Sequence, residues 1–228
     1  MLTFEGVSSC FYVWLNGAFV GYSEVSHGIS EFCVTDKLRD GENEISVLAI
    51  KFSTGSYLED QDMFRAAGIF REGYLLFRDR RRVRDITVGC TLADDFGTAT
   101  FTATFDGVLH KNATARLCTA DGADSGAFAQ RDGKTVTFVL RDPALWSSEV
   151  PNLYYICLEN GKEHIALPVG ARKIEVRDRV VLLNGKPVKA RGVNRHDSSP
   201  VLGYAVPMDA MLRDLAILKQ NNVNMIRT

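Results

Sequence analysis

Tight-turn dipeptides recur along this chain of 228 residues and restrict the folds open to it. Asn-Gly occurs at 16–17, 160–161 and 184–185, and Asp-Gly occurs at 40–41, 106–107, 121–122 and 132–133. Both dipeptides tolerate the positive φ angles that tight hairpins require. Their spacing predicts short antiparallel strands joined by turns, which is the pattern of one β-sandwich or a pair of them.

Apolar and polar residues alternate between these turns, as they do in strands with one buried face. The alternating stretches are 11–15, 18–22, 45–50, 101–105, 135–140 and 153–158. The pattern changes near Gly170. Residues 173–176 and 180–183 still indicate a hairpin, and a strand-like stretch at 187–190 follows them.

One stretch has clear helical periodicity and runs from Met208 to Asn221. Its apolar stripe consists of Met208, Met211, Leu212, Leu215 and Leu218. A strand-like stretch at 223–226 follows directly, and a strand, a helix and a strand in close succession predict the opening of a parallel α/β unit. Two strands and one helix cannot close a barrel, so we expect the apolar stripe to be exposed.

The chain is therefore predicted to be mainly β and to have three parts. Residues 1–79 form β-sandwich material, which offers about five strands where a jelly roll has about eight. Residues 80–170 form a second sandwich, and residues 171–228 form the start of an α/β domain.

Composition narrows the class of protein. A formal net charge of −1 with 46% hydrophobic residues is typical of a globular chain without a large basic face, which disfavours nucleic acid as a partner. We expect the basic run 78–84 to be a solvated linker or a strand edge. No apolar run is long enough for a transmembrane helix, and the start does not resemble a signal peptide. Five scattered cysteines indicate reduced, buried thiols, so a cytoplasmic protein without a membrane partner is expected.

Two stretches are candidates for chemistry. The acidic run 57–65 contains Glu59, Asp60 and Asp62, which could be oxygen ligands of a hard cation or could form a hydrated loop. The motif 191–197 contains His196 and follows the strand-like stretch 187–190, so it would occupy the carboxyl end of the first barrel strand, where ligand-contacting residues project. Arg227 occupies the matching place after the second strand. A satisfied histidine and a surface arginine remain the alternative.

An Asn-Glu pair can mark the acid of a glycosidase, and this chain has one at Asn43-Glu44. Because the pair leads directly into the stretch 45–50, we interpret it as a turn entering a strand.

These stretches resemble family 2 glycoside hydrolases of the β-galactosidase type, and the resemblance covers nearly the whole chain. Its motifs are 4–7, 12–17, 20–22, 41–43, 55–63, 68–71, 145–149, 151–154, 183–187, 191–197, 219–222 and 224–228. The resemblance implies an internal fragment that holds part of a sugar-binding jelly roll, an immunoglobulin-like β-sandwich domain and the N-terminal part of a catalytic TIM barrel.

The resemblance also implies roles for three residues. Asp62 matches a sodium ligand beside the 6-hydroxyl of the sugar, His196 matches a histidine of the galactosyl subsite, and Arg227 matches an arginine that supports the nucleophile. A retaining enzyme needs two carboxyl groups about 5 Å apart. In the family these are glutamates on later strands of the barrel, as are the magnesium ligands, and none of that sequence is present here.

The resemblance thus implies that the parent is a homo-oligomeric β-galactosidase. It would use Na⁺ and Mg²⁺ and release terminal β-D-galactose from galactosides such as lactose. We expect residues 1–228 to be inactive without the remainder of the barrel. Alternatives are a non-catalytic carbohydrate-binding or scaffold module, and a β-glucuronidase or β-mannosidase relative. The family usually has Trp at Phe64 and Glu at Asp197, and these departures bear on substrate preference.

Overall fold

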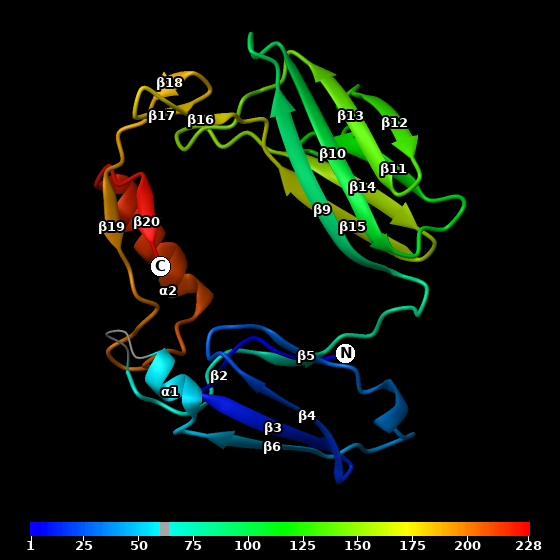
Figure 1. The fold of residues 1–228 in the computed structure, drawn as a ribbon, viewed down its shortest axis with the longest axis vertical. Coiled ribbons are helices and arrows are strands. Elements are labelled where there is room, and N and C mark those ends of the chain that lie inside the picture. Colours follow the sequence, from blue (N-terminus) through cyan, green and yellow to red (C-terminus); the bar gives the residue numbers. More distant parts are fainter. Residues whose placement is uncertain (60–63) are drawn as a thin grey trace. The chain divides into compact units, whose positions relative to one another are not determined.

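A computed structural model describes residues 1–59 and 64–228, and the contacts divide the chain into two compact units (Figure 1). Unit 1 comprises Met1–Phe77 and Arg191–Thr228, and unit 2 comprises Arg78–Ala190. The mainly β class is confirmed. The division into three domains at residues 79 and 170 stays a prediction.

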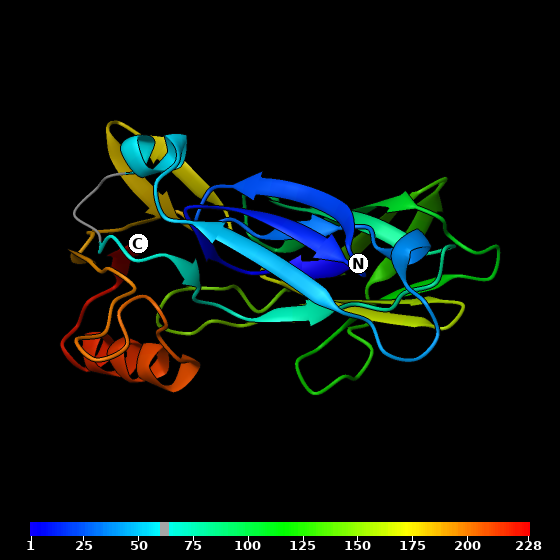
Figure 2. The ribbon, with the colours of Figure 1, turned by 90° about the horizontal axis from the view of Figure 1, so that it is seen from below.

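Unit 1 contains a β-sandwich made of two three-stranded antiparallel sheets. One has the order β5 (Ser30–Phe32), β1 (Leu2–Phe4) and β8 (Gly73–Leu75), and the other has the order β4 (Ala18–Glu24), β3 (Cys10–Leu15) and β6 (Ile45–Ile50). Figure 2 shows the blue strands of the second sheet side by side. A short pair, β2 (Val7–Ser8) with β7 (Gly68–Ile69), a 3₁₀ turn at Thr35–Lys37 and helix α1 (Thr54–Leu58) complete the sandwich.

Strand alternation explains the core of this sandwich. In β3 the side chains of Phe11, Val13 and Leu15 are buried, whereas Tyr12 and Trp14 between them are only partly covered. Phe11 meets Phe4 of the facing sheet edge to face, with ring centroids 5.2 Å apart, a favoured arrangement of aromatic rings. The hairpin from β3 to β4 turns at Asn16 and Gly17, both with positive φ, as its sequence predicts.

Unit 2 is a second sandwich. Its four-stranded sheet has the order β12 (Phe128–Asp132), β13 (Thr135–Arg141), β10 (Thr98–Gly107) and β9 (Val83–Leu92). Its three-stranded sheet has the order β11 (Thr114–Cys118), β14 (Tyr154–Asn160) and β15 (Glu163–Val169). The core between them includes Phe101, Phe105, Phe138 and Ile156, each at most 1% exposed. A small antiparallel sheet, β16 (Ile174–Arg177), β17 (Val180–Leu183) and β18 (Lys186–Pro187), also belongs to this unit.

Two local expectations were wrong. Asp106-Gly107 is not a hairpin turn, because it lies at the end of β10, where the register with β9 shifts in a bulge that tolerates the positive φ of Gly107. The five cysteines were expected to be buried, but Cys33 is exposed, because it follows the end of β5, and Cys90 and Cys157 are only partly buried. The pair Asn43-Glu44 does precede β6 in a turn, where the Asn43 side chain donates to the carbonyl of Arg39 at 2.8 Å.

The remainder of unit 1 is the strand–helix–strand segment, β19 (Gly192–Asn194), α2 (Met208–Gln220) and β20 (Met225–Arg227). The two strands pair in parallel, which confirms the predicted α/β unit. The first strand is not at 187–190 but lies inside the motif 191–197, and β20 includes Arg227. On α2, Met208, Leu212 and Leu215 are 68%, 57% and 48% exposed, so much of the apolar stripe is uncovered in the described residues.

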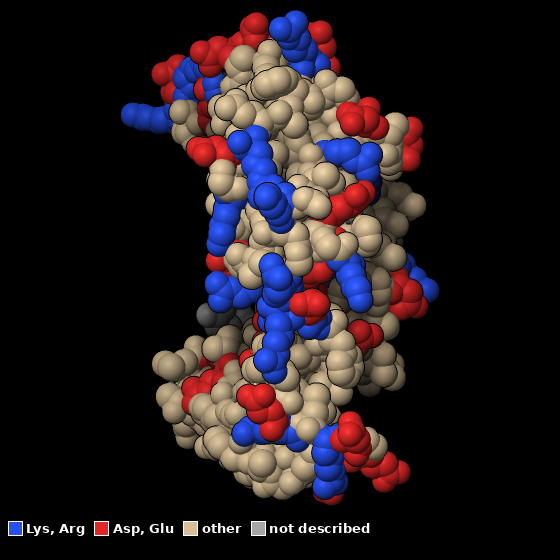
Figure 3. All heavy atoms as spheres, turned by 90° about the vertical axis from the view of Figure 1, so that its right-hand side faces the viewer, with Lys and Arg blue, Asp and Glu red and all other residues tan. Residues whose placement is uncertain are grey.

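The surface carries both signs of charge. On the face shown in Figure 3, Lys and Arg side chains are interspersed with Asp and Glu side chains. Among the described helices, none combines the length and the apolar character that crossing a bilayer demands.

Candidate functional site

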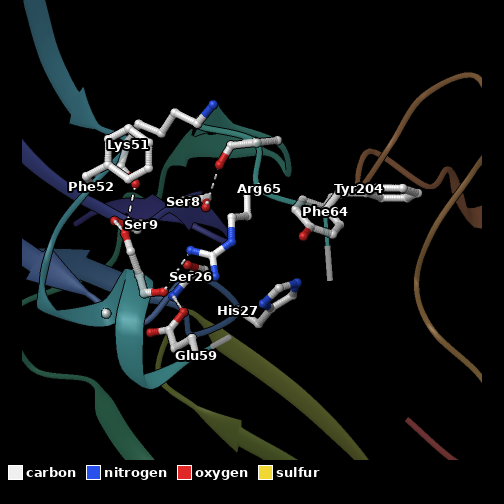
Figure 4. Close-up of a pocket in the computed structure, with 13 residues that line it drawn as sticks. Ser8, Ser9, Ser26, His27, Lys51, Phe52, Glu59, Phe64, Arg65 and Tyr204 are labelled. Atoms are coloured by element: carbon white, nitrogen blue, oxygen red, sulfur yellow. Dashed lines mark hydrogen bonds between the residues drawn. The ribbon is translucent and has the colours of Figure 1, made fainter. Parts of the chain in front are cut away.

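A pocket in unit 1 opens between the loops that follow β2, β4 and β6 and the loop that precedes α2 (Figure 4). Its volume is about 50 Å³. The lining is rich in hydroxyl and charged groups and includes Ser8, Ser9, Ser26, His27, Lys51, Ser56, Glu59, Phe64, Arg65 and Tyr204. Pockets that hold a small-molecule ligand are typically about 300–1,000 Å³ in volume, so this pocket by itself is too small to enclose a sugar.

Three hydroxyl groups fix the start of α1 at one side of this pocket. The Ser9 and Ser53 hydroxyls lie 2.7 Å apart, and Ser53 and Ser56 form a capping box at the start of the helix. The Ser56 hydroxyl accepts from the Ser53 N–H at 2.9 Å and donates to the carbonyl of Lys51 at 2.9 Å. These hydrogen bonds hold the N-terminus of α1 in place, and α1 in turn leads into the acidic run 57–65.

Glu59 is the last described residue before the gap at residues 60–63. Its carboxylate accepts a hydrogen bond from the backbone N–H of Ser26 at 3.2 Å, which ties the end of α1 to the loop after β4. Beside it, burial and the charge of Arg71 lower the pKa of His27, although Glu59 and Asp197 oppose the shift. One carboxylate of the acidic run therefore already has a structural partner.

Aromatic rings close the opposite side of the pocket. Tyr204, from the loop between β19 and α2, is 8% exposed and packs on rings from the sandwich. Its centroid lies 5.9 Å from that of Phe64, 5.7 Å from Phe70 and 5.7 Å from His27. Burial raises the pKa of the Tyr204 hydroxyl. The segment that carries His196 is thus in direct contact with the sandwich.

The structure brings together two of the three predicted site residues. His196 follows the end of β19, and Arg227 ends the neighbouring parallel strand β20, so the structure brings both to the carboxyl edge of the same two-stranded sheet. Both are exposed, and the Arg227 Nε donates to the Asn194 side chain at 3.0 Å. Neither lines the pocket. Asp62, the third predicted residue, lies outside the described residues.

Several pocket residues were missed by sequence reasoning. Ser9, His27 and Tyr204 come from three separate segments, and none stands in a motif whose spacing indicates a ligand. Phe64 was noted only because the family usually has Trp there. A metal site formed by three or more His, Cys, Asp or Glu side chains is not found among residues 1–59 and 64–228.

Two family models match the chain in order. The model for the sugar binding domain of glycosyl hydrolases family 2 matches residues 1–78, and the model for the TIM barrel domain of the same family matches residues 174–228. The chain belongs to glycosyl hydrolase family 2. This agrees with the partial sandwich and with the parallel unit β19–α2–β20.

Curated relatives of this family 2 chain are β-galactosidases. The protein from Staphylococcus xylosus is 40% identical over 228 residues, and the match covers 100% of this chain and 23% of the relative. The protein from Actinobacillus pleuropneumoniae is 41% identical over 231 residues, and the match covers 100% of this chain and 22% of the relative. The chain therefore spans less than a quarter of the length of these curated relatives.

Solved structures with a similar fold are β-glucuronidases. The enzyme from an uncultured Clostridium sp. superposes with a TM-score of 0.86 at 23% identity, covering 100% of this chain and 41% of that chain. The apo enzyme from Ruminococcus gnavus gives a TM-score of 0.85 at 21% identity, covering 100% and 42%. At this identity the likeness establishes the fold alone.

Proposed function

We propose that residues 1–228 are part of a retaining β-galactosidase that releases terminal β-D-galactose from β-galactosides such as lactose. The observation that carries the proposal is the 40% identity to a β-galactosidase over every residue of this chain. The likeness to β-glucuronidases, at 21–23% identity, supports a common fold and does not favour a uronic acid over galactose.

The strand ends supply groups suited to this reaction. His196 and Arg227 lie on neighbouring parallel strands and are exposed, so an imidazole and a guanidinium face solvent at an edge where barrel enzymes bind substrates. Donors aimed at charge that develops in the transition state stabilise it more than the ground state. We assign substrate binding to both residues, and the two carboxyl groups of the displacement to later strands of the barrel in the complete polypeptide.

We further assign Na⁺ to Asp62 and Mg²⁺ to groups elsewhere in the complete polypeptide. A carboxylate is a suitable ligand for a hard cation. The choice of Asp62 rests on the family resemblance, in which this position matches a sodium ligand; Glu59 of the same acidic run accepts a hydrogen bond from the Ser26 N–H. A bound sodium ion would add a positive charge near the hydroxyl groups of the sugar.

The test compares two polypeptides and two substrates. We expect the complete polypeptide to hydrolyse an aryl β-galactoside and to leave the matching aryl β-glucuronide intact, whereas residues 1–228 alone turn over neither. Preference for the glucuronide would refute the proposal. Turnover by residues 1–228, abolished by changing one of their own acids, would refute the assignment of the carboxyl pair.

A non-catalytic carbohydrate-binding module is the competing function, since the family model over residues 1–78 describes a sugar binding domain. Titration of residues 1–228 with galactose distinguishes the two. We expect no saturable binding, because much of the barrel that would surround the sugar lies outside these residues. Saturable binding that is lost in Asp62→Ala would favour the binding module.

A further inference from the structure

The residues on either side of His196 are held by ion pairs, whereas no described residue forms a hydrogen bond with the His196 ring. Within the described part of the chain, the His196 imidazole has no hydrogen-bond partner, and its backbone carbonyl accepts from the Ser198 N–H at 2.9 Å. Its neighbours Arg195 and Asp197 form an ion pair with each other. The position of the imidazole therefore depends on what holds these two neighbours.

Four alternating charges, which we call the charge chain, connect the sandwich to α2 through those neighbours. The Arg71 Nη2 lies 3.5 Å from the Asp197 carboxylate, Asp197 pairs with Arg195, and the Arg195 Nη2 lies 2.8 Å from the Asp214 carboxylate of α2. The Arg195 side chain is 14% exposed, so leaving it unpaired would be costly. Arg71 is the member of this chain that belongs to the sandwich.

Tyr204 provides a second, apolar attachment eight residues beyond His196. Its ring contacts Phe70, and the Arg71 guanidinium lies 5.5 Å from the centroid of the same Phe70 ring. Phe70 itself approaches the backbone so closely that a Cβ at Gly6 would lie 2.8 Å from its ring. The two attachments thus converge on one tightly packed ring of the sandwich.

We propose that Arg71 and Tyr204 are positioning residues, which hold the end of β19 against the sandwich so that His196 meets the galactosyl group of the substrate. The inference rests on the proposed function. The charge chain fixes the residue after His196, and Tyr204 fixes the loop that continues from it. A displacement of about 1 Å at a catalytic group can cost about 100-fold in rate, so loosening either attachment is expected to slow turnover.

The test uses Arg71→Gln and Tyr204→Ala in the complete polypeptide, with an aryl β-galactoside as substrate. We expect kcat to fall at least about tenfold while KM changes less than about twofold, because the interaction lost acts on the transition state. Arg71→Lys and Tyr204→Phe should recover much of the loss. Arg84→Gln is the matched control, since Arg84 forms an exposed ion pair with Asp106 in unit 2.

Hydrogen exchange gives a readout that does not depend on turnover. We expect both variants to exchange faster across residues 195–204 in the complete polypeptide, with no change in unit 2. If Tyr204→Ala fails to fold, the Arg71→Gln variant alone tests the inference. The Arg71 side chain is 30% exposed, so its replacement leaves no cavity in the core. Unchanged kcat and unchanged exchange in Arg71→Gln would overturn the inference.

The outcomes also separate this inference from the proposed function. A wild-type polypeptide that does not hydrolyse the galactoside refutes the function, and the exchange measurement then still decides whether the two residues hold the end of β19. Wild-type turnover with a raised KM and an unchanged kcat in both variants would assign the residues to ground-state binding and overturn their positioning role.

Discussion

The rings of Phe64 and Tyr204 lie against each other, with 5.9 Å between their centroids. Phe64 directly follows the undescribed stretch 60–63, and Tyr204 lies eight residues after His196. The contact therefore joins the chain just beyond the acidic run to the loop that continues from the end of β19. Two parts of the candidate site that are far apart in sequence become neighbours through these rings.

This contact predicts how Phe64 responds to substitution. We expect Phe64→Trp to retain galactoside turnover in the complete polypeptide, because an aromatic face remains for Tyr204 and the family usually has Trp there. Phe64→Ala should lower kcat/KM by about fivefold, since a pair of aromatic rings contributes about 1 kcal/mol beyond its buried area and about 1.4 kcal/mol corresponds to a tenfold change in rate. Steady-state kinetics of the two variants measure this difference. Equal kcat/KM in Phe64→Ala and Phe64→Trp would show that the ring contact is dispensable.

Replacing His196 should impair chemistry without impairing the fold. We expect His196→Phe to lower kcat/KM for an aryl β-galactoside by about 100-fold, a typical effect of removing one transition-state donor. Its melting temperature should stay within about 2 °C of wild type, because the side chain is exposed. His164→Phe in β15 is the matched control, as it also changes an exposed histidine. Equal losses in both variants would contradict a special role for His196.

Glu163 is predicted to make the stability of unit 2 sensitive to acid. Burial alone would raise the pKa of its carboxyl, but hydrogen bonds from Arg78, the Val83 N–H and Asn160 lower it by more. A lowered folded pKa gives stability that is present above the unfolded value of about 4.5 and is lost as the pH falls through the folded pKa.

The variant Glu163→Gln tests this dependence. This variant keeps the shape of the side chain but not its charge. We expect it to cost about 1.5–3 kcal/mol of unfolding free energy at pH 7, as for hydrogen bonds to a charged group. The cost should shrink as the pH falls below about 4.5. Urea unfolding at several pH values measures it, and a cost that does not vary with pH would rule out the carboxylate as its source.

The core of unit 2 predicts a contrast between two phenylalanines. Phe138 is 0% exposed at the centre of β13, whereas Phe128 on the neighbouring strand β12 is 67% exposed. We expect Phe138→Ala to cost about 3–5 kcal/mol by opening a cavity. Phe128→Ala should stay within about 0.5 kcal/mol of wild type. Chemical denaturation of both variants provides the comparison, and similar costs would contradict the described packing.

The uncovered stripe of α2 predicts association of the 228-residue chain. Leu212 and Leu215 are both more than 45% exposed on the same helix, and exposed apolar patches promote association. We expect the double change Leu212→Glu and Leu215→Glu to reduce binding of an apolar dye and self-association in ultracentrifugation. In the complete polypeptide we expect the same change to lower stability, because the remainder of the proposed barrel would cover this face of α2. If the double variant of the complete polypeptide were as stable as wild type, burial of this face of α2 would be contradicted.

The sequence by itself determined the local elements. Dipeptides such as Asn16-Gly17 fix hairpins through their own φ angles, and the apolar period of α2 needs only the spacing of its side chains. The family motifs likewise located His196 and Arg227 at the ends of strands. The sequence did not determine the limits of β19, because a strand of three exposed residues shows no alternation of apolar and polar side chains.

Only the tertiary structure decided which distant residues meet. Tyr204 packs on Phe64 and Phe70, and Asp197 pairs with Arg71, across more than a hundred residues of intervening chain. No sequence period links such positions, because their proximity follows from the pairing of strands and the packing of rings. The pocket formed by Ser9, His27 and Tyr204 arises in the same way, from loops that the fold brings together.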